Sequence, residues 1–390
     1  MRSDVVAHIN TDDLLHNYRI LRARCGPKVR FCAPLKADAY GHGLRTVAPV
    51  LREAGADYAA VATLQEAVEL RETGWDRPIL VLGNVLAVSQ LCEREARFSE
   101  VTRHRLSLTV ADASTIDCIA RHGNGSRVEV HLKVDTGMGR MGATPTEAVT
   151  LLRRCMKVPQ IRLAGIYSHF ATADLSDQDM ARKQLRSFRE LLDDAGSDLP
   201  VSTLRHLANS AATITLPEAH FDMVRPGLAL YGYLPSAHMA SQIDLRPVLR
   251  LITHVTLVKE LPAGHCIGYG RTYVTKRPTR IGILPVGYSD GYVRALSNLA
   301  VVGFTGGDAP VIGRISMDQL AVDLTDLPDA VCGSEATLID NRPDRPNSVQ
   351  SIADRLGTIP YEVTCLLGRR IDRVAVGKSC AKPPLVPSNT

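Results

Sequence analysis

One lysine of this chain stands where a buried strand gives way to a turn of small residues. The segment from Phe31 to Gly43 reads FCAPLKADAYGHG, so Lys36 ends an apolar run. A lysine that is partly desolvated on a rigid element can lose its proton near neutral pH and form a Schiff base with an aldehyde. Pyridoxal phosphate is the aldehyde that this chemistry suggests. A lone lysine at a strand end is more often simply solvated, so this interpretation depends on the residues around it.

The elements that would position Lys36 alternate regularly up to about Gly232. Short apolar runs predict eight strands, at 30–35, 58–62, 78–82, 106–110, 128–134, 161–168, 203–207 and 223–225. Amphipathic patterns predict helices between them, for example at 63–72, 144–154 and 178–194. Eight such units over roughly 200 to 250 residues are typical of the α/β class and of a (β/α)8 TIM-type barrel. A doubly wound sheet is the alternative, because periodicity does not report whether a barrel closes.

The pattern changes after the turn-rich segment 234–247. Strands are predicted at 248–260, 280–287, 309–323 and 336–340, and a single helix at 349–356. Without regular alternation of strand and helix, this part is predicted to be a mainly antiparallel β domain. We therefore divide the chain into a barrel at 1–240, a C-terminal β domain at 241–378 and a disordered tail at 379–390.

The composition narrows the class of protein. The 390 residues are 45% hydrophobic, yet no apolar run approaches the ~20 residues of a membrane span. The start, MRSDVVAHIN, lacks the layout of a secretion signal, so we expect a cytoplasmic protein without membrane contact. Nine scattered cysteines without a CxxC pair argue against a disulfide framework and a zinc site. The net charge of +5 comes from dispersed arginines, which favours a small anionic ligand over nucleic acid.

Polar residues follow several of the predicted barrel strands at their carboxyl ends, where barrel enzymes carry their active sites. They are Lys36, Lys133, Asp135, His169, Asn209, Ser210 and Arg225. The loops after the last two strands often bind phosphate, and the small residues at 209–212 and 227–228 suit that role. Each residue alone could be a cap or a turn residue. Together they predict one site at one mouth of the barrel.

A competing motif lies after the fifth predicted strand. The segment 137–142, GMGRMG, satisfies the GxGxxG pattern of a dinucleotide site. The next strand ends in His169, however, rather than in the acidic residue that would hold a ribose, and Arg140 occupies the loop. NAD binding is therefore kept only as an alternative.

Several segments together resemble a known enzyme family. Beside 31–43 they are HLKVDTGMGRMG (131–142), SHFATAD (168–174), HLANSAA (206–212), VRPGLALYG (224–232), GYGRTY (268–273), PVGYSDGY (285–292) and GRISMDQ (313–319). In this combination the chain resembles the alanine racemases that bind pyridoxal phosphate in a barrel domain. The resemblance extends to about Val376 and covers both predicted domains.

This resemblance implies an isomerase that interconverts L-alanine and D-alanine through a pyridoxal phosphate aldimine and supplies D-alanine for cell-wall synthesis. The cofactor, pyridoxal 5'-phosphate, would be bound by Lys36, Tyr40, His169, Asn209, Ser210, Arg225, Gly227, Leu228 and Tyr361. Arg225 is implied to face the pyridine nitrogen, to which an arginine donates a hydrogen bond without giving up its proton. A carboxylate there would favour a protonated ring and a stronger electron sink. The weaker sink should limit reprotonation at the wrong carbon and hence transamination.

Racemisation needs a proton removed from one face of the α-carbon and returned to the other, so two bases are required. The resemblance implies Lys36 for D-alanine and Tyr269 for L-alanine, with Tyr269 supplied by the second subunit of a homodimer. A tyrosine with an unperturbed pKa near ~10 is a poor base, and His169, linked between Tyr269 and Arg225, is placed to assist it.

Further residues are implied to bind the substrate. Arg140 and the backbone N–H of Met317, the latter from the partner subunit, would hold the carboxylate. Tyr288 and Asp318 would narrow the entrance. Lys133 would repel Arg140 if both stayed charged, and in many family members this lysine is carbamylated, which makes it an anion.

The chain departs from the family pattern at two places. Pro34 and Leu35 precede the lysine where small β-branched residues are usual, and 370–373 reads RIDR in place of RVPR. We expect the second departure to lie far from the chemistry. A decarboxylase on the same plan is an alternative, against which Arg225 argues, as is a pyridoxal phosphate carrier, which would not need the β domain. Serine or a broader substrate range also stays open.

Overall fold

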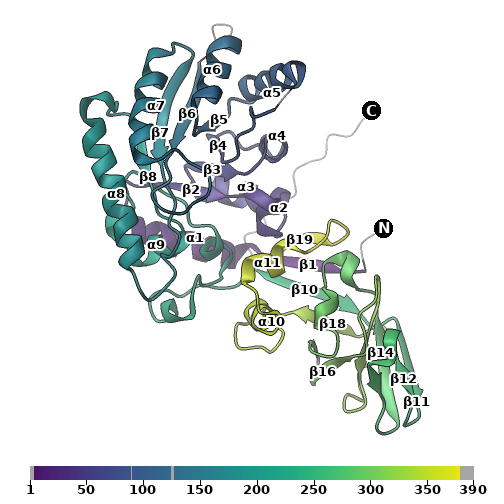
Figure 1. The fold of residues 1–390 in the computed structure, drawn as a ribbon. Helices are drawn as coiled ribbons and strands as arrows, with labels where there is room; N and C mark the ends of the chain where they lie inside the picture. The colour runs from purple at the N-terminus through teal and green to yellow at the C-terminus, as the bar shows by residue number, and fades with distance from the viewer. Residues whose placement is uncertain (1–3, 89, 124–126, 378–390) are drawn as a thin grey trace.

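The structure is a computed structural model that describes residues 4–88, 90–123 and 127–377. An eight-stranded parallel sheet with helices outside it is followed by a mainly antiparallel sheet (Figure 1), which confirms the predicted fold class. The predicted disorder of residues 379–390 falls outside the described residues. None of the helices in the described ranges combines the length and apolar character that crossing a bilayer requires.

All eight barrel strands form where the apolar runs predicted them. They are β2 (Arg30–Pro34), β3 (Tyr58–Val61), β4 (Ile79–Val81), β5 (Ser107–Val110), β6 (Val128–Lys133), β7 (Ile161–Tyr167), β8 (Leu204–His206) and β9 (Met223–Val224). They are arranged in the order β8-β7-β6-β5-β4-β3-β2-β9. Backbone hydrogen bonds from Asp222 N to Arg205 O and from Arg225 N to Ala208 O join the two ends. The sheet therefore curls round on itself, and the doubly wound alternative is wrong.

In the described part of the chain eight helices surround the barrel, and side-chain caps mark the start of five of them. They are α1 (Thr11–Cys25), α3 (Leu44–Ala54), α4 (Leu64–Glu72), α5 (Leu91–Arg103), α6 (Ala113–His122), α7 (Pro145–Lys157), α8 (Asp179–Ala195) and α9 (Ser210–Thr215). Thr63 with Glu66 and Thr144 with Glu147 form capping boxes that start α4 and α7. These caps explain why the two helices start within a residue of their predicted positions.

The second domain contains a nine-stranded sheet of order β11-β14-β17-β16-β15-β18-β10-β1-β19. Its strands are β1 (Val6–Asn10), β10 (Leu249–His254), β11 (Leu257–Leu261), β14 (Thr279–Leu284), β15 (Val301–Phe304), β16 (Gly307–Ile312), β17 (Leu320–Asp323), β18 (Glu335–Ile339) and β19 (Asp372–Val376). A hairpin of β12 (Cys266–Ile267) and β13 (Tyr273–Val274) projects from it. The predicted single strands 248–260 and 309–323 are each two strands, because β10 and β11 pair with different neighbours and β16 turns back to pair with β17.

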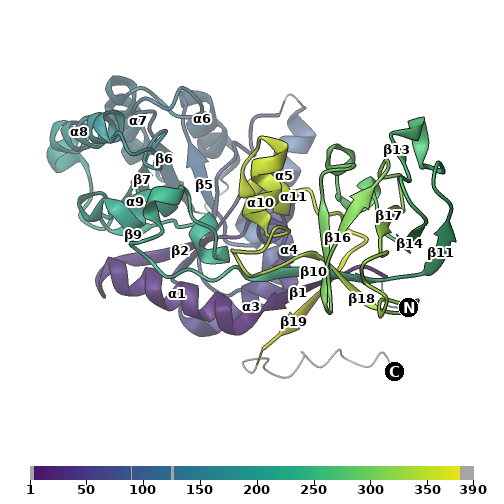
Figure 2. The same cartoon turned by 90° about the horizontal axis from the view of Figure 1, so that it is seen from below.

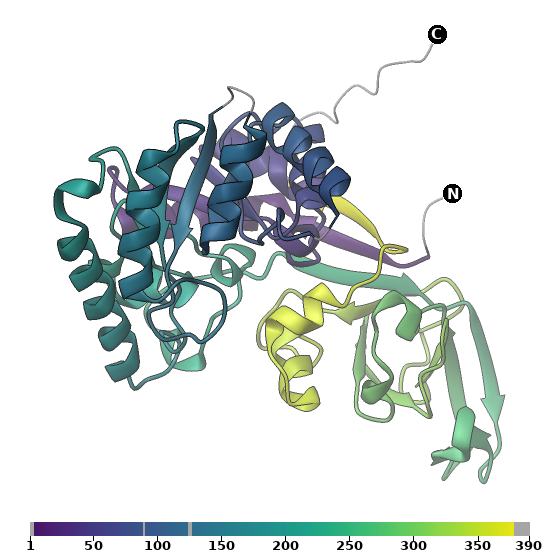
Figure 3. The same ribbon diagram turned by 45° about the horizontal axis from the view of Figure 1, so that its top comes forward.

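The two ends of the described chain lie side by side in this sheet. β1 pairs antiparallel with β10 and parallel with β19, as the purple, green and yellow strands show in Figure 3. The chain therefore starts in the second sheet and enters the barrel only after Asn10. The boundaries at 1–240 and 241–378 stay a prediction.

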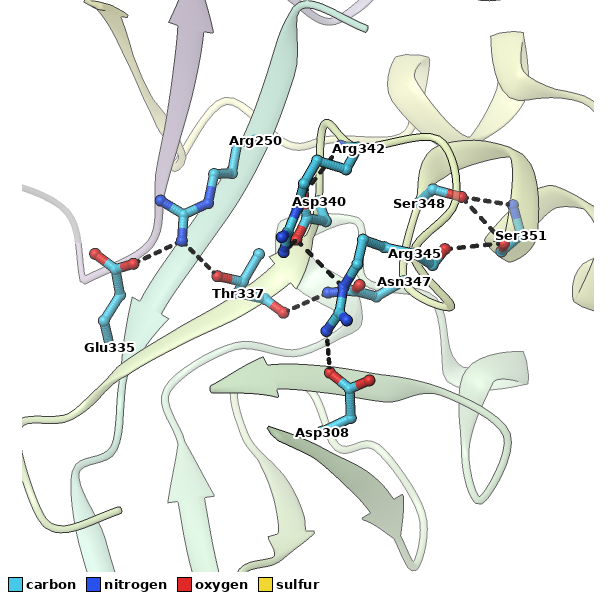
Figure 4. Close-up of polar contacts among 10 residues, drawn as sticks. All are labelled: Arg250, Asp308, Glu335, Thr337, Asp340, Arg342, Arg345, Asn347, Ser348 and Ser351. Atoms are coloured by element: carbon cyan, nitrogen blue, oxygen red, sulfur yellow. Dashed lines mark hydrogen bonds and ion pairs between the residues drawn. The ribbon is translucent and has the colours of Figure 1, made fainter. Parts of the chain in front are cut away.

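Two helices, α10 (Val349–Leu356) and α11 (Pro360–Cys365), lie between the barrel and the second sheet (Figure 2). A polar cluster holds the loop that leads into α10 (Figure 4). In it Arg342 Nη2 donates to Asp340 Oδ2 at 2.7 Å, Arg345 contacts Asp308, and Asn347 Nδ2 donates to Thr337 O at 2.8 Å. Ser348 then caps α10 by accepting from Ser351 N. This cluster fixes the helix pair that carries Tyr361 toward the barrel.

Candidate active site

The polar residues predicted to share the barrel mouth do follow the carboxyl ends of its strands. Lys36 lies two residues after β2, Lys133 ends β6, His169 follows β7, and Arg225 directly follows β9. Burial lowers the pKa of Lys36, and the charges of Arg140 and Arg225 lower it further. Burial also lowers the pKa of His169 well below its usual value, with Arg225 and Lys133 as the next causes. Several cations thus meet in one desolvated place, which favours a neutral Lys36 and an anionic ligand.

A left-handed turn sets the position of Lys36. The next four residues, Ala37 to Tyr40, have φ values of 52, 51, 55 and 56°. Each costs roughly 1–2 kcal/mol relative to right-handed backbone. Glu66 offsets part of this cost, because its Oε1 accepts from Ala37 N at 2.7 Å, and Asp38 Oδ1 accepts from Leu44 N at 2.6 Å. The turn carries Tyr40 back into the protein, where its side chain is buried.

Helix α11 and strand β19 pack directly on this turn. Arg373 donates from Nε to Gly41 O at 3.2 Å, and from its two Nη atoms to the carbonyls of Gly368, Ile371 and Leu367. A Cβ at Gly41 would lie 1.9 Å from Thr364 O, so glycine is required there. The expectation that residues 370–373 lie far from the chemistry is therefore wrong. Ile371 and Asp372, which depart from the family pattern, lie between Arg370 and Arg373. Arg370 donates to Asp318, and Arg373 donates to Gly41 O in the turn that follows Lys36.

We expect Arg373→Met to lower the free energy of unfolding by about 2–4 kcal/mol, because hydrogen bonds from a charged donor contribute ~1.5–3 kcal/mol each. Urea unfolding followed by fluorescence measures the change. Arg369→Met is the matched control, since Arg369 is exposed on the same segment. Equal destabilisation by the two variants would contradict the role of Arg373.

Arg225 is held rigidly at the end of β9. Its Nη2 donates to Ser168 O at 2.8 Å and approaches His169 Nδ1 at 3.4 Å, and its Nη1 lies 2.7 Å from His206 Nδ1. Within the described residues, Nε and the second N–H of Nη1 make no hydrogen bond. These are the N–H groups of Arg225 left to meet a ligand.

The other side of the mouth offers donors suited to a phosphate. Tyr40 lies beside Gly227, where a Cβ would come within 2.5 Å of the tyrosine hydroxyl, and its ring is 5.9 Å from that of Tyr361. Burial raises the pKa of Tyr40, and it raises the pKa of Tyr361 to about 12, so both hydroxyls stay protonated donors. Ser210 begins α9 after Asn209, whose Oδ1 caps the helix. Hydroxyls beside helix-start amides fit a phosphate group.

The glycine-rich loop after β6 is occupied by its own aspartate. The Asp135 carboxylate accepts from the backbone N–H groups of Gly137, Met138, Gly139 and Arg140 at 2.7–3.2 Å. In a dinucleotide site such amides would bind the pyrophosphate instead. The loop therefore presents the exposed Arg140 rather than free amides.

Of the second-domain residues, Tyr361 lies beside the barrel mouth, whereas Tyr269 is not brought to Lys36 within this chain. Tyr269 lies in the turn between β12 and β13, which Figures 1 and 2 show at the end of the second domain remote from α2 (Lys36–Tyr40). Tyr269 is 72% exposed, Met317 is 55% exposed and Tyr288 is 42% exposed. Ser289, the residue after Tyr288, connects that tyrosine to Met317, since its N–H and hydroxyl both donate to Met317 O. Asp318 accepts from Arg370 at 2.8 Å nearby.

Comparison with known proteins decides the family. Residues 9–235 match the family "Alanine racemase, N-terminal domain" and residues 248–375 match "Alanine racemase, C-terminal domain". The chain belongs to the alanine racemase family. It is 40% identical over 372 residues to the alanine racemase of Halothermothrix orenii, covering 94% of this chain and 95% of that one. It is 41% identical over 359 residues to that of Syntrophobacter fumaroxidans, covering 91% and 93%.

Solved alanine racemases have the same fold. The enzyme from Streptomyces lavendulae, a D-cycloserine producer, matches with a TM-score of 0.88 at 35% identity, covering 97% of this chain and 98% of that one. The enzyme from Bacillus anthracis with bound L-Ala-P matches with a TM-score of 0.87 at 32% identity, covering 97% and 96%. Alanine racemases are pyridoxal-phosphate-dependent isomerases that act on alanine.

Sequence reasoning missed three groups that support the site: Glu66, Arg373 and the pair His131 and His206. Arg373 acts through backbone carbonyls, which leaves no pattern in the sequence, whereas Glu66 stands three residues after Thr63, the spacing of a capping box. The two histidines stand in the motifs HLKVDTGMGRMG and HLANSAA, so their presence inside predicted strands was a usable signal.

Proposed function

We propose that this alanine racemase interconverts L-alanine and D-alanine with two bases on opposite faces of the α-carbon. The observation that carries this proposal is the desolvated Lys36 beside a buried arginine, Arg225, rather than a carboxylate. Its product D-alanine would be used in cell-wall synthesis.

Pyridoxal 5'-phosphate would be held by Lys36, with Tyr40, Ser210, Gly227, Leu228 and Tyr361 around its phosphate and Arg225, His169 and Asn209 as further contacts. When bound, it supplies a sink for the negative charge that develops at the α-carbon. Arg225 donates a hydrogen bond without losing its proton, so it moderates this sink. The pocket donors described above support this assignment.

Lys36 would remove and return the proton on the face of D-alanine, and Tyr269 of the partner subunit would do so on the face of L-alanine. His169 supports this arrangement, because its Nδ1 faces the Arg225 donor and its Nε2 therefore carries the proton. That N–H can stabilise the phenolate form of Tyr269. The base on the second face thereby gains the help that an unperturbed tyrosine needs.

A homodimer with shared sites is part of this proposal, and the exposure of Tyr269 and Met317 supports it. Both would enter the barrel mouth of a second copy, where the Met317 N–H and Arg140 would hold the substrate carboxylate. Tyr288 and Asp318 would narrow the entrance and favour a methyl side chain.

The function is tested by chiral chromatography of the purified protein, supplied with pyridoxal phosphate and incubated separately with L-alanine, L-serine and L-lysine. D-alanine is expected as the dominant product. Another D-amino acid as the main product would mean that the preferred substrate is that amino acid and not alanine. Carbon dioxide release without a D-product would favour a decarboxylase.

Lys133 is proposed to carry a carbamate. It is buried, and burial followed by the charges of Arg225 and Arg140 lowers its pKa well below the usual value. A neutral amine is the form that adds carbon dioxide, releasing a proton, and the resulting anion would be paired with Arg140. Electron density beyond the lysine nitrogen is expected in crystals grown with bicarbonate. A 13C signal that persists in Lys133→Met under 13C-bicarbonate would contradict the assignment.

A further inference from the structure

A chain of hydrogen bonds runs from Arg225 into the barrel interior. Arg225 Nη1 lies 2.7 Å from His206 Nδ1, and His206 Nε2 lies 2.9 Å from His131 Nδ1. Both histidines are fully buried, and His131 Nε2 has no hydrogen-bond partner within the described part of the chain. None of the proposed catalytic steps uses His131.

The chemistry of the groups gives this chain one direction. A guanidinium only donates, so His206 Nδ1 must accept and its proton must sit on Nε2. That N–H then donates to His131 Nδ1, which places the His131 proton on Nε2. Both rings are consequently neutral, each in a single tautomer.

The surrounding electrostatics agree with two neutral rings. Burial, followed by the charge of Arg225, lowers the pKa of His131 to about 3 and lowers the pKa of His206 well below its usual value. The charges that lower these two pKa values are those of Arg225, Arg162 and, where it is an unmodified and protonated amine, Lys133. A proton added to either ring would therefore be opposed by the permanent positive charge of Arg225.

The backbone is shaped to place His131 there. The pairing of β6 with β7 shifts register between Val130 and His131, and such bulges re-aim a side chain. Opposite the bulge, a Cβ at Gly165 would lie 2.2 Å from His131 Nδ1, so only glycine leaves room for the imidazole. Tyr167 stacks on His206 with ring centroids 4.7 Å apart and planes 3° apart, which fixes the plane of that ring.

We propose that His131 is a positioning residue for Arg225. By accepting from His206 Nε2, it keeps His206 Nδ1 as the acceptor that holds Arg225 Nη1, and so leaves Nε to face the ligand. This inference rests on the proposed function in that the ligand atom opposite Nε is the cofactor ring nitrogen. Without His131, the His206 N–H would be unsatisfied in the barrel interior. If the His206 proton moved to Nδ1, Nε2 would no longer be an unsatisfied donor. His206 Nδ1–H and Arg225 Nη1–H would then be two donors facing each other, with no acceptor between them.

The tautomers are tested on protein labelled with 15N-histidine, both without cofactor and with it. Long-range 1H–15N spectra are assigned by comparison with His131→Asn and His206→Asn. We expect both histidines to be neutral with the proton on Nε2, and unchanged from about pH 6 to about pH 9. A proton on His206 Nδ1, or a doubly protonated ring at neutral pH, would overturn the proposal.

Kinetic variants test the consequence for Arg225. His131→Leu removes the acceptor and should lower kcat by about 10- to 100-fold with little change in KM, the range typical of outer-shell partners. His131→Asn keeps an acceptor near the position of Nδ1 and should recover much of the loss. Equal losses in Leu and Asn variants would show that only packing matters and would overturn the proposal.

Gly165→Ala is a second test of the role of His131, and this substitution removes no polar group. Its Cβ would displace His131, so it should lower kcat as His131→Ala does, and the double variant Gly165→Ala/His131→Ala should be no worse than His131→Ala. Additive losses would contradict a shared mechanism. If wild-type protein showed the stated tautomers but formed no D-alanine, the proposed function would fail while the hydrogen-bond chain would stand.

Discussion

A hybrid dimer of two inactive subunits is expected to be active. When a Lys36→Ala subunit pairs with a Tyr269→Phe subunit, one site keeps both bases and the other loses both, so about half of the wild-type activity should return. The reason is geometric: Tyr269 is exposed at the end of the second domain that is remote from α2, and in the proposed homodimer it would reach the barrel mouth of the other copy. Co-expression with two different tags isolates the hybrid, and the rate of D-alanine formation is then measured.

The reciprocal hybrid is the matched control. A wild-type subunit paired with a Lys36→Ala/Tyr269→Phe double variant has one defective base in each shared site and should be inactive. If both bases acted within one chain, the results would be exchanged: this hybrid would have half activity and the first hybrid none.

Tyr269→Phe on its own should separate the two directions of the reaction. Removing a positioned general base typically costs 10²–10⁴-fold, so exchange of the α-proton of L-alanine with deuterated water should fall by about 10³-fold. Exchange from D-alanine, which depends on Lys36, should fall much less. Proton NMR of each enantiomer follows both rates.

Tyr273→Phe, in the adjacent strand β13, is the control for disturbance of the hairpin and should leave both exchange rates close to wild type. Equal loss of exchange from both enantiomers in Tyr269→Phe would mean that Tyr269 is not a base for one face.

The barrel was predictable because each of its strands is a short apolar run bounded by polar turns. Helix starts were predictable where a capping box exists, as at Thr63 and Thr144. Strand β1 was not predictable, because its place between β10 and β19 depends on pairing across more than 240 and 360 residues of sequence, respectively. The division of 248–260 into two strands depends on tertiary turns in the same way.

The site was predictable to a comparable extent. The polar residues after barrel strands could be assigned to one mouth from strand order alone, whereas Tyr269 and Met317 could be assigned only from the family resemblance. Arg373 escaped notice because its partners are backbone carbonyls, among them Gly41 more than 330 residues earlier. The hydrogen-bond chain from Arg225 through His206 to His131 depends on the bulge at His131 and on the space left by Gly165. Neither could be predicted from the sequence, because both depend on how β6 pairs with β7.

The position of β1 also governs how the enzyme is completed on the ribosome. β1 is translated more than 360 residues before its neighbour β19. Until then β1 has a free edge, and free strand edges promote aggregation. A polypeptide terminated before Asp372 would lack both this strand and Arg373. Translation through β19 is therefore a precondition for a catalyst, and products terminated before it should be substrates for proteolytic quality control.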